Sequence, residues 1–185
     1  MTTPHDQSAF AAYEALWQRI RDGGVWVHYD GVALDEGGHF QHDGCGKLKK
    51  PEIQITRSHY NERERPTEFL NTGEPAPIVN ELMTLAHEYG HYLSWSREPA
   101  SKTWKAYHAA VVRRDKLAAN GRDAVSKGLS RREMQLICDE ETLAWKLGRE
   151  FIPDGLHTDY DEHSRLGVHY HRYRLGLDEL WPEDK

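Results

Sequence analysis

The sequence predicts a single domain of the α+β class, in which a short, mostly antiparallel sheet is followed by a set of helices. Its 185 residues suit one hydrophobic core, and a mean hydropathy of −0.82 indicates a largely polar surface. Both segments with strand character end by Arg57, whereas the apolar residues of the later segments recur at helical spacing. We therefore expect one α+β domain that spans residues 1–185.

A helix and a strand are expected at the N-terminal end. Ser8 can cap a helix whose apolar residues recur at helical spacing until the pair Gly23-Gly24 ends it. Residues 25–29 follow, and their valine and aromatic side chains are typical of a β-strand.

A second strand is expected before the longest polar stretch of the chain. A glycine-rich turn region runs through Gly46, and Ile53 and Ile55 then alternate with polar neighbours within residues 51–57. Residues 61–77 are polar and contain three prolines, so we expect them to form a loop that leads into the next helix.

The helix expected over residues 78–95 carries two histidines. At about 100° per residue its apolar side chains fall on one broad arc, whereas His87 and His91 lie on the narrower polar arc with Glu88 at its flank. This distribution is expected of a buried helix that lines a cleft.

Residues 87–91 read H-E-Y-G-H, which matches the metal-binding pattern H-E-x-x-H. Residues four apart lie on one helix face, so His87 and His91 can offer imidazole nitrogens to one Zn²⁺ while Glu88 acts as a base. The pattern is typical of zinc metalloproteases. Because a catalytic zinc ion usually takes three protein ligands, we expect a further ligand from elsewhere in the fold.

Two further helices are expected after the motif. Residues 101–118 have the spacing of an amphipathic helix with a packing role. Ser130 and Glu133 match a capping box, which opens a helix that should run to about Ile152 before Pro153 ends it.

The helix that follows Ser130 offers two glutamates as the third metal ligand. Glu140 and Glu141 both project into its apolar side, where an ionised carboxylate is costly unless it is paired or binds a metal. The helical projection does not separate the two. The small residues Ala144 and Gly148 would let this helix pack tightly against the motif helix and bring one carboxylate to the histidines.

The H-E-x-x-H sequence, followed by E-E-T-L-A-W at residues 140–145, resembles the gluzincin pattern of H-E-x-x-H and then E-x-x-A found in intracellular ImmA/IrrE-type and ArdC-like metallopeptidases. The resemblance implies a zincin-like fold, with a strand bordering the active-site cleft before the motif helix. It favours Glu141 as the third zinc ligand, with Glu140 as the alternative. The sequence departs from the pattern in the long spacer over residues 95–129, and in Trp145, where relatives often show Asn, Asp or Glu.

A different third ligand would be His108, by resemblance to SprT-like proteins. The H-G pattern that is usual in those proteins is absent here, because Ala109 follows His108.

The expected chemistry is metal-assisted hydrolysis of a peptide bond. Zn²⁺ lowers the pKa of water and polarises the carbonyl, while Glu88 accepts the proton and passes it to the leaving amine. Zn²⁺ is preferred over Mg²⁺ because two imidazoles and a carboxylate make a mixed nitrogen and oxygen site. Residues 53–57 are expected to bind an extended substrate by β-augmentation. An oxyanion donor is expected in the C-terminal segment, where the candidates are Tyr160, His163, His169, Tyr170 and His171.

The composition of the chain indicates which binding partners and which cellular compartment to expect. The formal net charge of −6 and the scattered basic residues argue against nucleic acid as a partner without excluding it. No segment approaches the ~18 apolar residues of a membrane span, and Cys45 and Cys138 do not make a disulfide framework. We expect a soluble cytoplasmic protein that acts on a protein or peptide; the oligomeric state is not predicted.

The alternative function is a binding or regulatory module that keeps the zincin fold without physiological proteolysis. The resemblance permits it, because ImmA/IrrE-like proteins include stress and mobile-element regulators and ArdC-like proteins combine such a domain with single-stranded DNA binding. A further alternative is an α+β domain without metal, in which Glu140 or Glu141 pairs with a basic residue.

Overall fold

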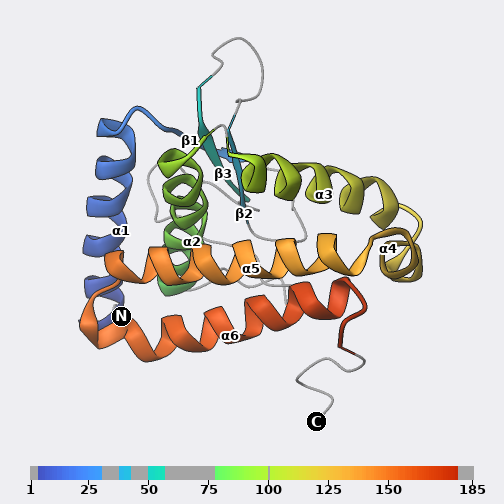
Figure 1. The fold of residues 1–185 in the computed structure, drawn as a ribbon. Helices are drawn as coiled ribbons and strands as arrows, with labels where there is room; N and C mark the ends of the chain where they lie inside the picture. Colours follow the sequence, from blue (N-terminus) through green and yellow to red (C-terminus); the bar gives the residue numbers. More distant parts are fainter. Residues whose placement is uncertain (1–3, 31–37, 43–49, 57–77, 100, 179–185) are drawn as a thin grey trace.

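The computed structural model describes residues 4–30, 38–42, 50–56, 78–99 and 101–178 (Figure 1). Within this part of the chain, six α-helices and a three-stranded sheet confirm the α+β class. In chain order the elements are α1 (Pro4–Asp22), β1 (Trp26–Asp30), β2 (Gly38–Gln41), β3 (Glu52–Thr56), α2 (Ile78–Arg97), α3 (Lys102–Ala118), α4 (Arg122–Gly128), α5 (Arg131–Gly148), 3₁₀ turns at Arg149–Phe151 and Asp154–Leu156, and α6 (His157–Arg174).

The sheet is mixed, and its strand order is β1-β3-β2. β3 pairs in parallel with β1 and antiparallel with β2. The expectation of a mostly antiparallel sheet is therefore wrong for one of the two pairings. β2 is a strand of only four residues that starts at Gly38, inside the region expected to be a glycine-rich turn, so its short alternation was hidden in the sequence.

The position of β3 corrects the expectation for residues 53–57. β3 is the central strand, and its backbone already pairs with β1 on one side and β2 on the other. It therefore has no edge that an extended peptide could join. Among the described residues, the edges of the sheet belong to β1 and β2; Arg57 and the expected loop over residues 61–77 lie outside the described residues.

The first helix begins earlier than the sequence predicts. α1 starts at Pro4, and proline suits the first helical position because its fixed φ is already helical and its missing N–H would have no partner there. Ser8 therefore lies inside the helix. The end is confirmed: α1 stops at Asp22, and Gly24 has a φ of 78°, a conformation that favours glycine.

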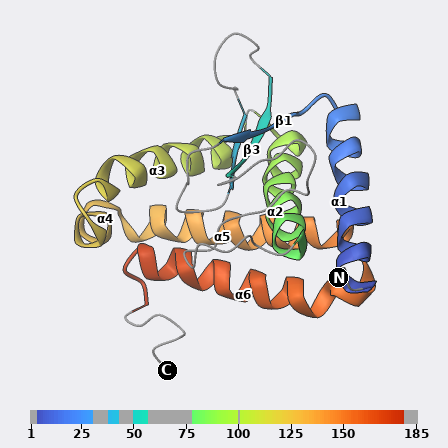
Figure 2. The same ribbon diagram turned by 180° about the vertical axis from the view of Figure 1, so that it is seen from behind.

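Helices on two sides hold α2 in place. α1 runs beside α2, α5 crosses α2, and α6 runs beside α5 (Figures 1 and 2). The side of α2 that faces α1 and the sheet belongs to a continuous core of buried apolar side chains, which includes Ile20, Ile53, Ile55, Leu82, Met83, Leu85 and Ala86.

The crossing of α2 and α5 depends on small residues. A Cβ atom added to Gly90 would lie 2.0 Å from the carbonyl oxygen of Ala144, and one added to Gly148 would lie 2.3 Å from the carbonyl oxygen of Ala86. The expected close approach at Ala144 and Gly148 is confirmed. Gly90, in the middle of the H-E-x-x-H motif, is the matching small residue on α2. This contact presses the histidine-bearing face of α2 against α5.

The other end of α5 packs in a second core. Ser130 and Glu133 form the expected capping box: the Ser130 hydroxyl accepts from the Glu133 N–H at 3.3 Å, and the Glu133 carboxylate accepts from the Ser130 N–H at 2.7 Å. α5 ends at Gly148, and a 3₁₀ turn continues to Phe151, close to the expected end at Ile152.

None of the helices in the described part of the chain combines the length and the hydropathy of a membrane span.

Candidate metal centre

The histidines of α2 are buried. His87 and His91 have exposed fractions of 7% and 5%, and Glu88 between them has 4%. Their rings meet at a centroid distance of 4.7 Å, which follows from the spacing of four residues on a helix. The polar arc of α2 is thus not a solvated face but one wall of an internal site.

Glu141 on α5 completes a cluster with the two histidines. Its Oε2 atom lies 3.2 Å from Nε2 of His87 and 3.5 Å from Nε2 of His91. One ligand atom from each of the three residues lies within 4.8 Å of the others. The cluster is buried and can hold a metal ion.

Two observations fit a metal ion in the cluster. Within the described structure, Oε2 of Glu141 is buried without a hydrogen bond, although imidazole nitrogens lie around it. The distances of 3.2 and 3.5 Å are also close to the edge of a tetrahedron, ~3.3 Å, around an ion with ligand bonds of about 2.0 Å. The donor set of two imidazoles and one carboxylate suits Zn²⁺.

The electrostatics of the cluster favour a cation. Burial lowers the pKa of His87 to about 4, so this ring is neutral, as a metal ligand must be. Burial also acts to lower the pKa of His91, but Glu141 and Glu140 outweigh it and hold that pKa well above its usual range. Burial acts to raise the pKa of Glu141, but His171 and His91 keep it well below its usual range. The metal-free cluster therefore pairs the ionised carboxylate of Glu141 with a protonated His91, and a metal ion would take the place of that proton.

Glu140 and Glu141 have different partners. The Oε1 atom of Glu140 lies 3.4 Å from Nδ1 of His91, and its Oε2 atom accepts a hydrogen bond from the Ser94 hydroxyl at 3.0 Å. A carboxylate at Nδ1 fixes the ring so that Nε2 is left for a metal. The structure thus places Glu141 in the cluster that could hold a metal ion and Glu140 behind His91.

Trp145 supports His87 by stacking. The two rings lie 4.2 Å apart at an interplanar angle of 22°, and the backbone oxygen of Trp145 accepts a hydrogen bond from the Tyr160 hydroxyl at 2.8 Å. Among the described residues, Nδ1 of His87 is buried without a hydrogen bond. A packing contact therefore takes the place of the acceptor that usually orients a ligand histidine.

His171 on α6 is the fourth residue at the centre. Its Nε2 atom lies 3.4 Å from Oε2 of Glu141, and the side chain is largely buried. The sequence left it among several candidates. One signal could have singled it out: Tyr160, Gly167 and His171 are seven and four residues apart, so they share one face of α6. A Cβ atom on Gly167 would lie 2.9 Å from the Trp145 ring, so this face packs on α5.

The other candidates from the C-terminal segment do not line the cavity at the centre. Tyr160 is buried in the core. His163 contacts the backbone oxygen of Asp159, His169 lies 3.4 Å from Asp178, and the Tyr170 hydroxyl accepts from Arg174.

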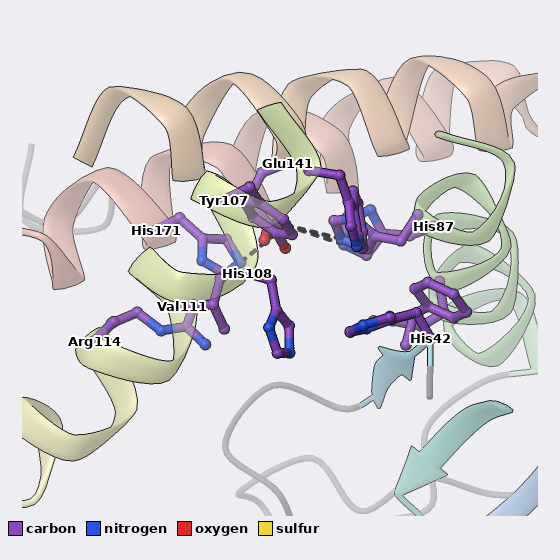
Figure 3. Close-up of a pocket in the computed structure, with 12 residues that line it drawn as sticks. His42, His87, Tyr107, His108, Val111, Arg114, Glu141 and His171 are labelled. Carbon is purple, nitrogen blue, oxygen red and sulfur yellow. Dashed lines mark ion pairs between the residues drawn. The ribbon is translucent and has the colours of Figure 1, made fainter. Parts of the chain in front are cut away.

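A cavity of about 100 Å³ opens in front of the three clustered residues (Figure 3). The described residues that line it are Phe40, His42, His87, Glu88, His91, Trp104, Tyr107, His108, Val111, Arg114, Glu141 and His171. Five of them come from α3, for which we expected a packing role, with His108 as an alternative third ligand. The long spacer that departs from the gluzincin pattern thus supplies one wall of the site.

Two residues of α3 have distinct places in this wall. His108 lies against His42, with ring centroids 4.6 Å apart, and it does not belong to the metal-binding cluster of the described residues. Tyr107 stacks beside His91 at 6.3 Å and 15°, and sequence reasoning missed it. Burial, reinforced by Glu141 and Glu140, raises the pKa of Tyr107 well above its usual range, so it stays a neutral hydrogen-bond donor.

Of the two cysteines, only Cys138 lies in the described part of the chain, and it does not belong to the cluster of His87, His91 and Glu141. Cys138 is a buried free thiol, and burial raises its pKa to about 11, so it stays protonated. Cys45 lies outside the described residues.

Comparisons with known proteins return no relative. A scan of protein-family models and searches of curated proteins and of solved structures give no significant match.

Proposed function

We propose that this protein is a zinc-dependent metallopeptidase of gluzincin type that hydrolyses peptide bonds. One observation carries the proposal: His87, His91 and Glu141 form a buried cluster that can hold a metal ion, and Glu88 lines the same cavity. In this function the two histidines and Glu141 hold Zn²⁺. A bound zinc ion supplies Lewis acidity and makes water easier to deprotonate at neutral pH.

Glu88 is the general base in this proposal. It accepts a proton from the attacking water and returns it to the leaving amine, as one carboxylate can do in sequence. Its position next to His87 on α2 keeps it beside the cluster, and burial at 4% exposure keeps bulk water away. Glu140 orients His91 through Nδ1.

Two side chains that line the cavity can stabilise the oxyanion. His171 comes from the C-terminal segment where such a donor was expected, and its Nε2 atom reaches Glu141 at 3.4 Å. Tyr107 faces the same cavity from α3 as a neutral phenol. Either can donate a hydrogen bond to developing negative charge.

The substrate in this proposal is a peptide in extended conformation, and β2 is the strand that would bind it. β2 lies at the edge of the sheet, and Phe40 within it and His42 just after it line the cavity. An edge strand offers unpaired backbone groups to a peptide. This role replaces the one expected for residues 53–57.

The experiment compares wild type with Glu88→Gln, both loaded with one equivalent of zinc and incubated with a proteome-derived peptide library read by mass spectrometry. We expect the variant to bind zinc as wild type does and to cleave ~100-fold to 10,000-fold more slowly. Cleavage that persists at the wild-type rate in Glu88→Gln, or a zinc-loaded wild type that cuts nothing, would contradict the proposal.

The second candidate function is a metal-dependent binding or regulatory module without proteolysis, and His171 is the observation that favours it. His171 lies outside the cluster of His87, His91 and Glu141, but its Nε2 atom is 3.4 Å from Oε2 of Glu141. A fourth protein ligand from this position would close the site that a catalytic zinc keeps for water. The absorption spectrum of the cobalt-substituted protein separates the two functions. A spectrum that shifts on adding acetohydroxamate indicates an open position, whereas one that responds only in His171→Ala indicates a closed one.

A further inference from the structure

The cavity in front of the metal-binding cluster is not uniform in charge. At the inner end lie the two carboxylates, Glu88 and Glu141, with the histidines of α2. The outer wall, formed by α3 and the end of β2, carries His42, His108 and Arg114. Among the described residues that line this outer wall, none is acidic.

Arg114 is the only Lys or Arg among the described lining residues. Trp104, His108, Val111 and Arg114 are three or four residues apart, so one face of α3 presents all four to the cavity. Figure 3 shows the Arg114 side chain extending from α3 below Val111 toward the space around His108.

The environment of Arg114 suits a residue that binds an anion. Its side chain is only 13% exposed, and its Nε atom donates to Asp115 at 2.9 Å. Asp115 is 59% exposed and is not among the described residues that line the cavity. A guanidinium group has five donors in a planar fork that matches a carboxylate.

We propose that Arg114, with His108 beside it, forms a subsite for a carboxylate on the substrate next to the bond that is cut. The proposal rests on the proposed peptidase function and names its substrate class: peptides with either an acidic side chain or the C-terminal carboxylate at this position. A cation at His87, His91 and Glu141 adds to the positive potential of the cavity. The free volume of about 100 Å³ admits a small group of this kind.

The test uses binding rather than turnover. Three hydroxamate-capped dipeptides of the same length serve as probes: one with an aspartate side chain and an amidated C-terminus, one with asparagine and a free C-terminus, and one with asparagine and an amidated C-terminus. Their dissociation constants are measured by calorimetry on the zinc-loaded full chain. We expect one of the anionic probes to bind ~10-fold or more tightly than the neutral one, as a charge-assisted hydrogen bond provides.

Matched variants assign the preference to one residue. Arg114→Met should abolish it and Arg114→Lys should retain part of it. Arg113→Met should leave the charge preference intact. This variant removes the same charge from the same helix, but Arg113 is 56% exposed and pairs with Glu133. Thermal melts confirm that each variant is folded.

Whichever anionic probe binds more tightly shows whether the subsite prefers an acidic side chain or a C-terminal carboxylate. Equal binding of all three probes to wild type, no binding of any probe, or an undiminished preference in Arg114→Met would overturn the proposal. Its failure is distinguishable from failure of the peptidase function. A charge preference without any peptide cleavage leaves the subsite standing, whereas cleavage without a charge preference removes the subsite alone.

Discussion

Replacing Gly90 by alanine tests whether the crossing of α2 and α5 builds the metal centre. The new Cβ atom would lie 2.0 Å from the carbonyl oxygen of Ala144, whereas an ordinary contact is at least 3.4 Å, so the two backbones would have to separate by about 1.4 Å. Because the obstacle is backbone, a change of rotamer cannot relieve it. We expect a cost of about 3 kcal/mol from overpacking, against a gain of about 1 kcal/mol from the helix preference of alanine.

The net loss of about 2 kcal/mol corresponds to a Tm lower by roughly 4 to 8 °C for a chain of this size. Glu141 lies one helical turn from Ala144, so the same displacement moves its carboxylate away from the histidines by more than a metal site tolerates, about 0.2 Å. The affinity for zinc should therefore fall at least ~10-fold.

The assay combines urea unfolding of the metal-free protein with competitive zinc titration. Gly155→Ala is the matched control, because nothing lies within 4 Å of the Cβ atom added there, and it should change neither quantity. If Gly90→Ala unfolds at the same urea concentration and binds zinc as tightly as wild type, the reasoning about this crossing is refuted.

Three further outcomes are expected. Glu141→Gln should weaken zinc binding more than Glu140→Gln. For Glu140→Gln we expect the zinc affinity to fall ~10-fold to 100-fold, as is typical of a residue that orients a ligand. Equal losses of affinity in a zinc titration would contradict the separate roles of the two glutamates. Tyr160→Phe should lower the free energy of unfolding by about 1 to 2 kcal/mol, since the Trp145 oxygen loses a buried donor, and an unchanged urea midpoint would argue against that bond. In metal-free protein the pKa of His87 falls from 6.5 when unfolded to about 4 when folded, so only the unfolded state binds that proton between these values and stability drops as the pH falls through them. His87→Gln should show a smaller decrease of unfolding free energy over this range, and an unaltered pH profile would show that His87 is not buried as a neutral ring.

Four of the described helices, α1, α2, α3 and α5, were predictable because each carries local signals that the fold does not override. The helices α4 and α6 were not predicted. The capping box at Ser130 and Glu133 marks the start of α5, and the helical spacing of α2 survives in full. The sheet was less predictable. β2 has four residues, too few to show an alternation, and the partners of β3 depend on contacts between segments distant in the sequence.

The centre shows the same division. The spacing of His87 and His91 on one helix predicts them as metal ligands. Glu140 and Glu141 are predicted as candidates because they are charged residues on an apolar helix face. Which glutamate faces the histidines depends on the rotation and depth of α5 against α2, which Gly90 and Ala144 set and no helical projection contains. The spacing of Tyr160, Gly167 and His171 could have placed His171 on the face of α6 that packs on α5. That it reaches Glu141 depends on how α6 folds back along α5, which no local pattern contains.

The most direct test of the metal centre is anomalous scattering at the zinc edge from a crystal of protein purified without chelators and without added metal. The structure leads us to expect one strong anomalous peak per chain, within bonding distance of Nε2 of His87, Nε2 of His91 and the carboxylate of Glu141. The distance of this peak from His171 would also show whether the fourth coordination position of the metal is open or is occupied by His171. Absence of a peak at these residues after zinc is supplied in solution, or a peak held by other side chains alone, would contradict the account.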